Sequence, residues 1–255
     1  MTGTAALWLL DLREPVCRGG ADDPRDALSA PERARADRLA SPASAERYVR
    51  ARTAIRRVLA ATVGGRPGGL RIAAAPGGRP VLVDHPRWCV SWSRSAWALL
   101  VAVRRDEPIG ADVEVVRHVD SGTRVLGTVY PGADRLGDLA TPEAFFSAWT
   151  LLEAAVKATG RGLARGGREV RLVRADGAAR CELAGVDSAG GAPWWGRTRL
   201  VAAPRATRAG SGRPAGDRVM VAVVSRGRAV PLALHAWPAE GPSTARTVRT
   251  TGAGR

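Results

Sequence analysis

The spacing of apolar and polar residues along the chain predicts a mixture of helices and strands. A short apolar run at residues 5–10 predicts a first strand, and the polar stretch at 13–30 predicts a loop. The segment Ser29-Ala-Pro-Glu32 is typical of a helix start, because a capping serine is followed by proline and then by an acid. Residues 44–63 carry apolar side chains at helical spacing and are followed by two glycines, which predicts a second helix.

The next part of the chain predicts short strands separated by turns, because β-branched and aromatic residues alternate with glycine, proline and serine. Strands are expected at residues 71–74, 81–83, 88–93, 97–104 and 109–116. A third helix is expected from the capping Thr141 to Thr159, since proline and an acid occupy its first turn and Gly160 ends it. Closing strands are then expected at residues 169–175, 179–183, 198–203 and 219–224.

These elements form two strand–helix–strand groups, with a boundary near residues 105–110. No sequence repeat relates the two groups. Residues 204–216 are dominated by arginine and small residues and are expected to form a mobile loop. Beyond about residue 239 the composition predicts a disordered tail.

The composition argues against several classes of protein. Hydrophobic residues make up 45% of the chain, which argues against a wholly disordered protein. The longest apolar runs are far shorter than the roughly 20 residues that span a bilayer, and the N-terminal run lacks the features of a signal peptide. Cys17, Cys89 and Cys181 are widely spaced and odd in number, so no disulfide framework or metal knuckle is expected. We therefore expect a cytoplasmic protein with no membrane partner.

A net charge of +15 would suit binding to a nucleic acid or another polyanion. However, 38 of the 39 basic residues are arginine, which together with abundant alanine and glycine indicates the coding bias of a GC-rich genome. The chain has no helix-turn-helix pattern, zinc spacing or aromatic–basic motif, so a nucleic acid partner is not expected. Lys157 is the only lysine, which indicates either a need for an ammonium group there or chance survival.

Two acids lie close together on one predicted strand. In the segment Gly110-Ala-Asp112-Val-Glu114 the two-residue period of a strand places Asp112 and Glu114 on one face and the valines on the other. Like charges side by side repel unless a cation or solvent separates them, and hard cations such as magnesium prefer carboxylate oxygens. The pattern therefore indicates either a metal site or an exposed strand face on which both acids are solvated.

The third predicted helix carries a second group of polar residues. Trp149, Glu153 and Lys157 are spaced i, i+4, i+8 and share one helix face. An ordinary exposed glutamate–lysine pair is the alternative, but the neighbouring residues are apolar. The turn Gly160-Arg-Gly-Leu163 follows at once and would allow close approach by a phosphate group.

These motifs resemble those of the 4′-phosphopantetheinyl transferases, specifically the larger, pseudo-dimeric type that acts on carrier domains of peptide and polyketide synthetases. The resemblance rests on Gly-x-Asp-x-Glu followed by Trp-x-x-x-Glu-Ala-x-x-Lys-x-x-Gly-x-Gly-Leu, and it covers roughly residues 5–225. It includes Arg47-Tyr48 with Arg52 and Arg56 in the first half, the turn Gly78-Arg79-Pro80, the segment Val90-Ser91-Trp92-Ser93 and the last core strand at 216–224.

Two positions depart from the family pattern. Trp92 stands where the family has a histidine that helps to hold the nucleotide end of coenzyme A. Leu152 stands where the family has a lysine that contacts substrate phosphate. Trp92 is expected either to stack on the adenine or to be an ordinary core tryptophan, and the loss of two cations should weaken binding of coenzyme A.

The resemblance implies an α+β fold with two similar halves, each a helix packed on a small antiparallel sheet, with coenzyme A bound in the cleft between them. The expected divisions are an N-terminal half at residues 1–108, a C-terminal half with the metal site at 109–238, and the tail at 239–255.

The resemblance also implies a reaction in which a serine of an apo carrier protein attacks the β-phosphate of coenzyme A. Adenosine 3′,5′-bisphosphate then leaves, and the phosphopantetheine arm is transferred. The implied magnesium ligands are Asp112, Glu114 and Glu153, with Glu153 also a candidate base and Lys157 neutralising charge on the pyrophosphate. Arg52 and Arg79 would hold the 3′-phosphate, with Ser91 nearby. The protein is expected to be a monomer, and the alternative is a degenerate member that binds coenzyme A or a carrier with little transfer.

Overall fold

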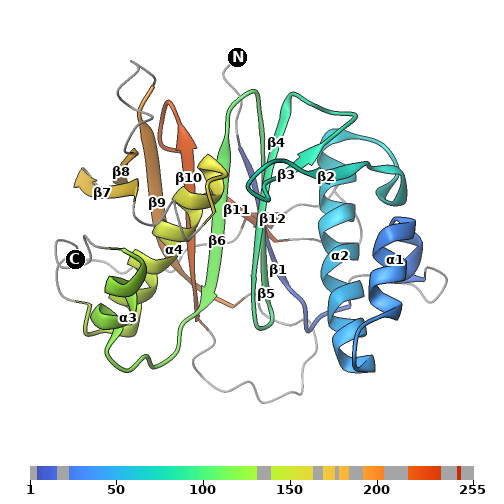
Figure 1. Cartoon of the computed structure of the whole chain (residues 1–255), viewed down its shortest axis with the longest axis horizontal. Coiled ribbons are helices and arrows are strands. Elements are labelled where there is room, and N and C mark those ends of the chain that lie inside the picture. The colour runs from blue at the N-terminus through green and yellow to red at the C-terminus, as the bar shows by residue number, and fades with distance from the viewer. Residues whose placement is uncertain are drawn as a thin grey trace.

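A computed structural model describes residues 5–15, 23–130, 139–162, 169–175, 178–183, 192–203, 218–236 and 246–247. This part of the chain has a mixed α+β architecture with two β-sheets. Figure 1 shows α1 (Ala30–Asp37) and α2 (Pro42–Val63) on one side of the strands and α3 (Gly122–Val129) and α4 (Pro142–Thr159) on the other. The fold class expected from the sequence is confirmed at this level.

The first sheet has the strand order β12-β11-β1-β5-β4-β3-β2 and is antiparallel except for the β1–β11 pair. Its strands are β1 (Ala6–Asp11), β2 (Ile72–Ala74), β3 (Pro80–Leu82), β4 (Trp88–Ser95), β5 (Ala98–Arg105), β11 (Leu234–Ala236) and β12 (Arg246–Thr247). Leu7 of β1 pairs with Leu234 of β11, so a late segment of the chain completes the sheet that the first strand begins.

The second sheet has the strand order β6-β10-β9-β8-β7 and is antiparallel throughout. Its strands are β6 (Ile109–Val115), β7 (Val170–Ala175), β8 (Ala178–Leu183), β9 (Trp194–Ala202) and β10 (Arg218–Arg226). Strand β6 lies at one edge of this sheet, next to β4 and β5 of the first sheet (Figure 1).

Two helices begin with the capping residues that the sequence predicts, Ser29 and Thr141, whereas the helix expected from residue 44 begins at Pro42 with Ser41 as its cap. The α-helices are α1 (Ala30–Asp37), α2 (Pro42–Val63), α3 (Gly122–Val129) and α4 (Pro142–Thr159), and short 3-10 helices are η1 (Pro24–Ala27) and η2 (Pro67–Gly69). Ser41 caps α2, Thr141 caps α4, and both helices have proline in the first turn. Gly160 ends α4 in the left-handed conformation, with φ of 71°.

Three apolar cores hold these layers together. Helix α2 covers one face of the first sheet, and α3 and α4 cover one face of the second. The remaining faces of the two sheets pack on each other, with Leu9 and Leu100 from the first sheet and Val113 and Val221 from the second. The two sheets therefore share a core.

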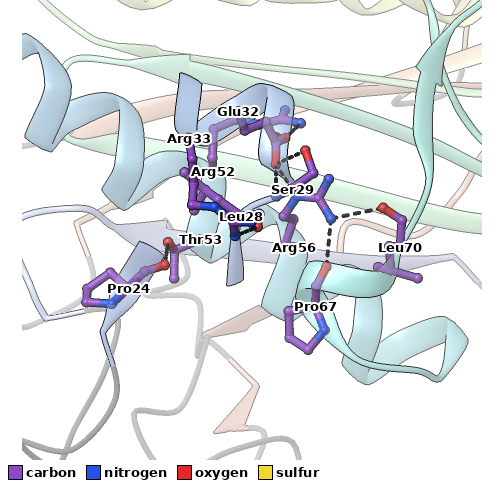
Figure 2. Close-up of polar contacts among 10 residues, drawn as sticks. All are labelled: Pro24, Leu28, Ser29, Glu32, Arg33, Arg52, Thr53, Arg56, Pro67 and Leu70. Atoms are coloured by element: carbon purple, nitrogen blue, oxygen red, sulfur yellow. Dashed lines mark hydrogen bonds and ion pairs between the residues drawn. The ribbon is translucent and has the colours of Figure 1, made fainter. Parts of the chain in front are cut away.

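A buried carboxylate ties α1 to α2. Glu32 accepts hydrogen bonds from Arg52 and Arg56, and Arg56 also donates to the carbonyls of Pro67 (2.7 Å) and Leu70 (3.0 Å), as Figure 2 shows. Arg56 is only 2% exposed. A buried arginine requires such partners, since an unpaired buried charge is costly.

Several sequence predictions differ from the structure. The stretch at 13–30, expected to be a loop, contains η1, and β9 begins at Trp194 instead of residue 198. Helix α3 and strand β11 were not predicted, and β12 lies within the segment expected to be a disordered tail. The expected loop at 204–216, Cys17 and most of the tail lie outside the described residues.

Candidate active site

Strand β4 faces β6 with three alternating serines, Ser91, Ser93 and Ser95. The backbone N–H of Ala111 donates to Ser91 Oγ (3.0 Å), and the N–H of Val115 donates to Ser95 Oγ (3.2 Å). These amides belong to an edge strand and would otherwise lack partners there. We call this serine row with its β6 partners the serine seam; it joins the two sheets through side chains.

Asp112 lies at the centre of the site and is only 3% exposed. Its Oδ1 accepts hydrogen bonds from Ser93 Oγ (2.6 Å) and from Lys157 Nζ (2.6 Å), and Lys157 Nζ also donates to Ser93 Oγ (2.9 Å). Its Oδ2 is buried and has no hydrogen-bond partner in the described part of the chain. The solvated strand face that the sequence left open is therefore excluded for Asp112.

Glu114 lies one serine further along the seam and is held from both sides. Ser95 donates to its Oε2 (2.5 Å), and so does Arg117 (3.1 Å). Val113, on the opposite face of β6, is fully buried in the core between the sheets. The alternation of acids and valines predicted from the two-residue period is confirmed.

The carboxyl groups of the site influence one another. Burial raises the pKa of Asp112, opposed by Lys157 and Ser93 and reinforced by the charge of Glu114. Burial also raises the pKa of Glu153, opposed by Lys157 and reinforced by the charges of Asp112 and Glu114. The ionised acids are therefore under mutual repulsion, which a further cation would relieve.

Helix α4 lies close to strand β6 through a backbone contact, which brings Glu153 and Lys157 near the acids of β6. A Cβ atom at Gly110 would lie 2.0 Å from the carbonyl oxygen of Ala154 and 2.5 Å from the nitrogen of Ala158. Only glycine fits there. The glycine of the Gly-x-Asp-x-Glu motif thus sets the distance between β6 and α4.

A cavity of about 240 Å³ opens beside these groups. It is lined by Gly77, Gly78, Arg79, Pro80, Ser91, Trp92, Glu153, Val156, Lys157, Gly160 and Gly162. Two glycine turns form one wall, because Gly77, at φ of 88°, lies against the carbonyl oxygen of Gly160. Five of the predicted site residues, from strand β4, the turn before β3 and helix α4, therefore lie on one cavity. A larger open groove beside η1 and η2 contains none of the predicted site residues.

The other predicted residues lie around this cavity in different ways. Arg52 is not part of the lining; its guanidinium is hydrogen bonded to Glu32 and lies 5.3 Å from the centre of the Trp92 ring. Leu152 is fully buried in the core beneath α4. The position that departs from the family lysine therefore contributes to packing.

The donor set suits a hard divalent cation, although it is not a preformed site. Within the described residues, no three His, Cys, Asp or Glu side chains are gathered closely enough to hold a metal ion. The buried, unpartnered Oδ2 of Asp112 and the mutual repulsion of the three acids are the features that fit a divalent cation.

None of the helices in the described ranges is long and apolar enough to span a membrane.

Comparison with known proteins agrees with this chemistry. The profile of the 4′-phosphopantetheinyl transferase superfamily matches residues 108–192, which contain β6 and α4. The 4′-phosphopantetheinyl transferase HetI of Nostoc sp. is 30% identical over 167 residues, which cover 62% of this chain and 70% of that protein. The chain belongs to the 4′-phosphopantetheinyl transferase superfamily.

A further transferase relative is less similar. The putative 4′-phosphopantetheinyl transferase slr0495 of Synechocystis sp. is 26% identical over 177 residues, which cover 64% of this chain and 68% of the relative. The protein is accordingly an enzyme, a transferase of this type, and the family recognised from the sequence is confirmed.

Sequence reasoning missed the contacts of Ser93, Ser95 and Glu32. The repeat Ser91-x-Ser93-x-Ser95 is a detectable signal, since a two-residue period places all three hydroxyls on one strand face. The pairing of Glu32 with Arg52 crosses 20 positions and has no comparable signal.

Proposed function

We propose that this transferase moves the 4′-phosphopantetheine group from coenzyme A to a serine of an apo carrier protein, with magnesium. The observation that carries the proposal is the cavity where Glu153 and Lys157 of α4 meet Arg79 of the turn between β2 and β3, with Asp112 hydrogen bonded to Lys157. This arrangement combines carboxylates for a cation with cations for phosphate, as phosphoryl transfer requires.

We assign the magnesium ligands to Asp112, Glu114 and Glu153. When bound, the ion would neutralise charge on the pyrophosphate oxygens. The Oδ2 of Asp112 is the group most in need of such a partner, because burial leaves it without a hydrogen bond in the described structure.

The chain's own residues then hold the substrate and move the proton. Lys157 supplies an ammonium group to the pyrophosphate, and Arg79 supplies a guanidinium fork to a phosphate from across the cavity. We assign Glu153, whose pKa is raised by burial, as the base that accepts the proton of the carrier serine. Ser91 and Trp92 line the side on which the nucleotide end would lie.

The size of the cavity limits which part of coenzyme A it receives. Its 240 Å³ lies below the range of about 300 to 1,000 Å³ that is usual for whole ligand sites. We therefore place the pyrophosphate in this cavity, between two similar halves of the molecule, and the nucleotide along Trp92. Arg79 is the stronger candidate for the 3′-phosphate, because the guanidinium of Arg52 is already bound to Glu32.

The test is transfer itself. Purified protein, coenzyme A, MgCl2 and an apo carrier domain should give a carrier whose mass rises by one phosphopantetheine group. The Glu153→Gln variant should give less than about 1% of that rate, since it removes a ligand and the proposed base. If the wild type leaves the carrier unmodified while a known transferase modifies it, the proposal is wrong.

A degenerate binding protein is the alternative, and the presence of Trp92 in the cavity favours it. Such a protein would bind coenzyme A equally well with and without magnesium and would transfer nothing. The burial of Leu152 in the core weakens this alternative, because that departure introduces no group into the cavity.

A further inference from the structure

One hydroxyl group connects three elements of the site. Ser93 lies on β4 of the first sheet, Asp112 on β6 of the second, and Lys157 on α4. Ser93 Oγ donates to Asp112 Oδ1 at 2.6 Å and accepts from Lys157 Nζ at 2.9 Å. The Asp112–Lys157 contact at 2.6 Å closes a triangle of hydrogen bonds. A residue outside the three acids therefore contacts both an acid and the ammonium.

The chemistry of a hydroxyl gives this triangle a fixed direction. Serine has one proton to donate, and Asp112 receives it, while the ammonium of Lys157 can only donate. Both donors meet the same carboxylate oxygen, Oδ1, so Oδ2 is the oxygen left without a partner in the described structure. Ser93 and Lys157 together thereby leave Oδ2 as the oxygen of Asp112 that is open to a cation.

The serine seam holds Ser93 in place. Ser91 and Ser95, two residues to either side, accept hydrogen bonds from β6 backbone amides at 3.0 and 3.2 Å. Because strand side chains repeat every two residues, these contacts fix the register of β4 on β6 at the position of Ser93. These two contacts join serine hydroxyls to backbone amides, so they do not involve Asp112 or Lys157.

From this geometry we infer that Ser93 is a positioning residue for the metal acid and the ammonium, supplied by the first sheet to a site otherwise carried by β6 and α4. The inference rests on the proposed function, because it assigns Asp112 Oδ2 to the cation. Outer partners of metal ligands commonly change metal affinity by 10- to 100-fold when removed. The first sheet would then contribute to the cation as well as to coenzyme A.

The experiment measures magnesium binding without turnover. MgCl2 is titrated calorimetrically into protein saturated with coenzyme A, in the absence of any carrier. Ser93→Ala should raise the Mg2+ dissociation constant about 10-fold, and Ser93→Thr, which keeps the hydroxyl, should restore most of the affinity. Binding of coenzyme A without magnesium should weaken less than the Mg2+ affinity does in Ser93→Ala, since Lys157 keeps its hydrogen bond to Asp112.

Ser147→Ala is the matched control. Ser147 is a partly buried serine of α4 whose hydroxyl is hydrogen bonded to Thr198 Oγ1 at 2.9 Å, with no hydrogen bond to the three acids in the described structure. It should leave the Mg2+ dissociation constant unchanged while costing similar stability, which thermal unfolding reports. A Ser93→Ala variant that is folded and binds Mg2+ as tightly as the wild type would overturn the inference.

The outcomes separate this inference from the proposed function. If the wild type binds Mg2+ and transfers the arm but Ser93→Ala is unaffected, only the role of Ser93 is wrong. If the wild type shows no magnesium-dependent signal, the proposed function fails first. Loss of affinity in both Ser93→Ala and Ser93→Thr would indicate a purely packing role and would also overturn the inference.

Discussion

The site contains single ionisable residues that are shielded from water. Asp112 is almost fully buried and Glu153 is half-buried, and burial raises the pKa of both. Lys157, the only lysine of the chain, offsets part of this cost for both acids. A buried acid of this kind is poised to exchange its proton for a metal ion.

The affinity for magnesium should therefore depend on pH in a range where exposed carboxyls are inert. Each acid must lose its proton to bind the ion, so the Mg2+ affinity should fall as the pH falls through the raised pKa values. The decline should therefore lie at a higher pH than that of an exposed carboxyl, which titrates at about pH 4. Calorimetric titration between about pH 5 and 8 would measure it, and an affinity that stays constant across this range contradicts the prediction.

Without magnesium, the raised pKa values of Asp112 and Glu153 should make the folded state more stable as the pH falls, whereas the Mg2+ affinity should decrease. The folded protein binds more protons than the unfolded chain at mildly acidic pH, so the contribution of these acids becomes more favourable as the pH falls toward the raised pKa values.

Trp92 offers a second prediction at this scale. Its ring lines the cavity and lies 5.3 Å from the Arg52 guanidinium, while neither group forms a hydrogen bond or ion pair with the three acids in the described structure. Trp92→Ala should raise the KM for coenzyme A about 10-fold and change kcat less than about 3-fold, since it removes binding surface and leaves the reacting groups in place. Steady-state kinetics with a carrier would measure both constants.

Trp97→Ala is the control for that variant. Trp97 also packs with an arginine, Arg13, at 4.1 Å, but it lies outside the cavity. Its KM for coenzyme A should match the wild type. A Trp92→Ala variant with unchanged KM would indicate an ordinary packing role for Trp92.

At the scale of elements, regular patterns were predictable and distant pairings were not. The helical period of residues 44–63 and the cap at Thr141 predicted α2 and α4 closely, because these signals are local. Strand β11, only three residues long, was missed because its place beside β1 depends on a partner more than 200 positions away. The motif predicted the acids, but the serines that hold them became visible only through the packing of β4 on β6.

The contact between β6 and α4 gives a prediction for an element pair. Gly110→Ala would place a Cβ 2.0 Å from the Ala154 carbonyl oxygen, so the helix must move away from the strand. We expect a loss of about 2 kcal/mol in unfolding free energy and a weaker affinity for Mg2+, because Glu153 would move away from Asp112. Urea unfolding and the magnesium titration would measure these effects.

Gly127→Ala is the matched control for this change. No atom lies within 4 Å of a Cβ at Gly127, which is in helix α3. This variant should be neutral or more stable by up to about 1 kcal/mol, since alanine favours the helix. Equal behaviour of the two glycine variants would contradict the role assigned to Gly110.

The α1–α2 pair gives a stability prediction with a definite pH sign. Burial acts to raise the pKa of Glu32, but the Ser29 amide and the charges of Arg52 and Arg56 outweigh it and hold the pKa below its usual value. The unfolding free energy of Glu32→Gln should be about 3 kcal/mol lower than that of the wild type at neutral pH, because the substitution leaves Arg56 buried without its charge partner.

The difference in unfolding free energy between the wild type and Glu32→Gln should narrow as the pH falls below about 4. A lowered carboxyl pKa contributes stability above the unfolded value and loses it as the pH falls through the folded value. Glu46→Gln, which breaks the exposed pair with Arg50 on α2, should cost less than about 0.5 kcal/mol throughout. Denaturant midpoints at several pH values would measure the stability of both variants. A loss of stability in Glu32→Gln that does not depend on pH would mean that the packing of the side chain, and not its charge, stabilises the protein.

At the scale of the whole molecule, the two sheets depend on each other. The core between them combines residues of β1 and β5 with residues of β6 and β10, and the serine seam adds hydrogen bonds across the same interface. The boundary expected near residue 108 divides the sequence, but β11 returns from the later segment to the first sheet. The cavity is lined by residues of the first sheet and of α4, and α4 packs on the second sheet, so the site depends on how the two sheets are held together.

Unfolding should therefore be a single cooperative event, which Leu234 can test. Leu234 of β11 is 1% exposed and packs in the core between the sheets, so Leu234→Ala should lower the unfolding free energy by about 3 kcal/mol. Amides of β4 in the first sheet and β10 in the second should lose hydrogen-exchange protection by the same amount, because both report the same global opening. Leu200→Ala, at a position 38% exposed, should change protection by less than about 1 kcal/mol. Protection lost in β4 but kept in β10 would mean that the sheets unfold separately and that their shared core adds no cooperativity.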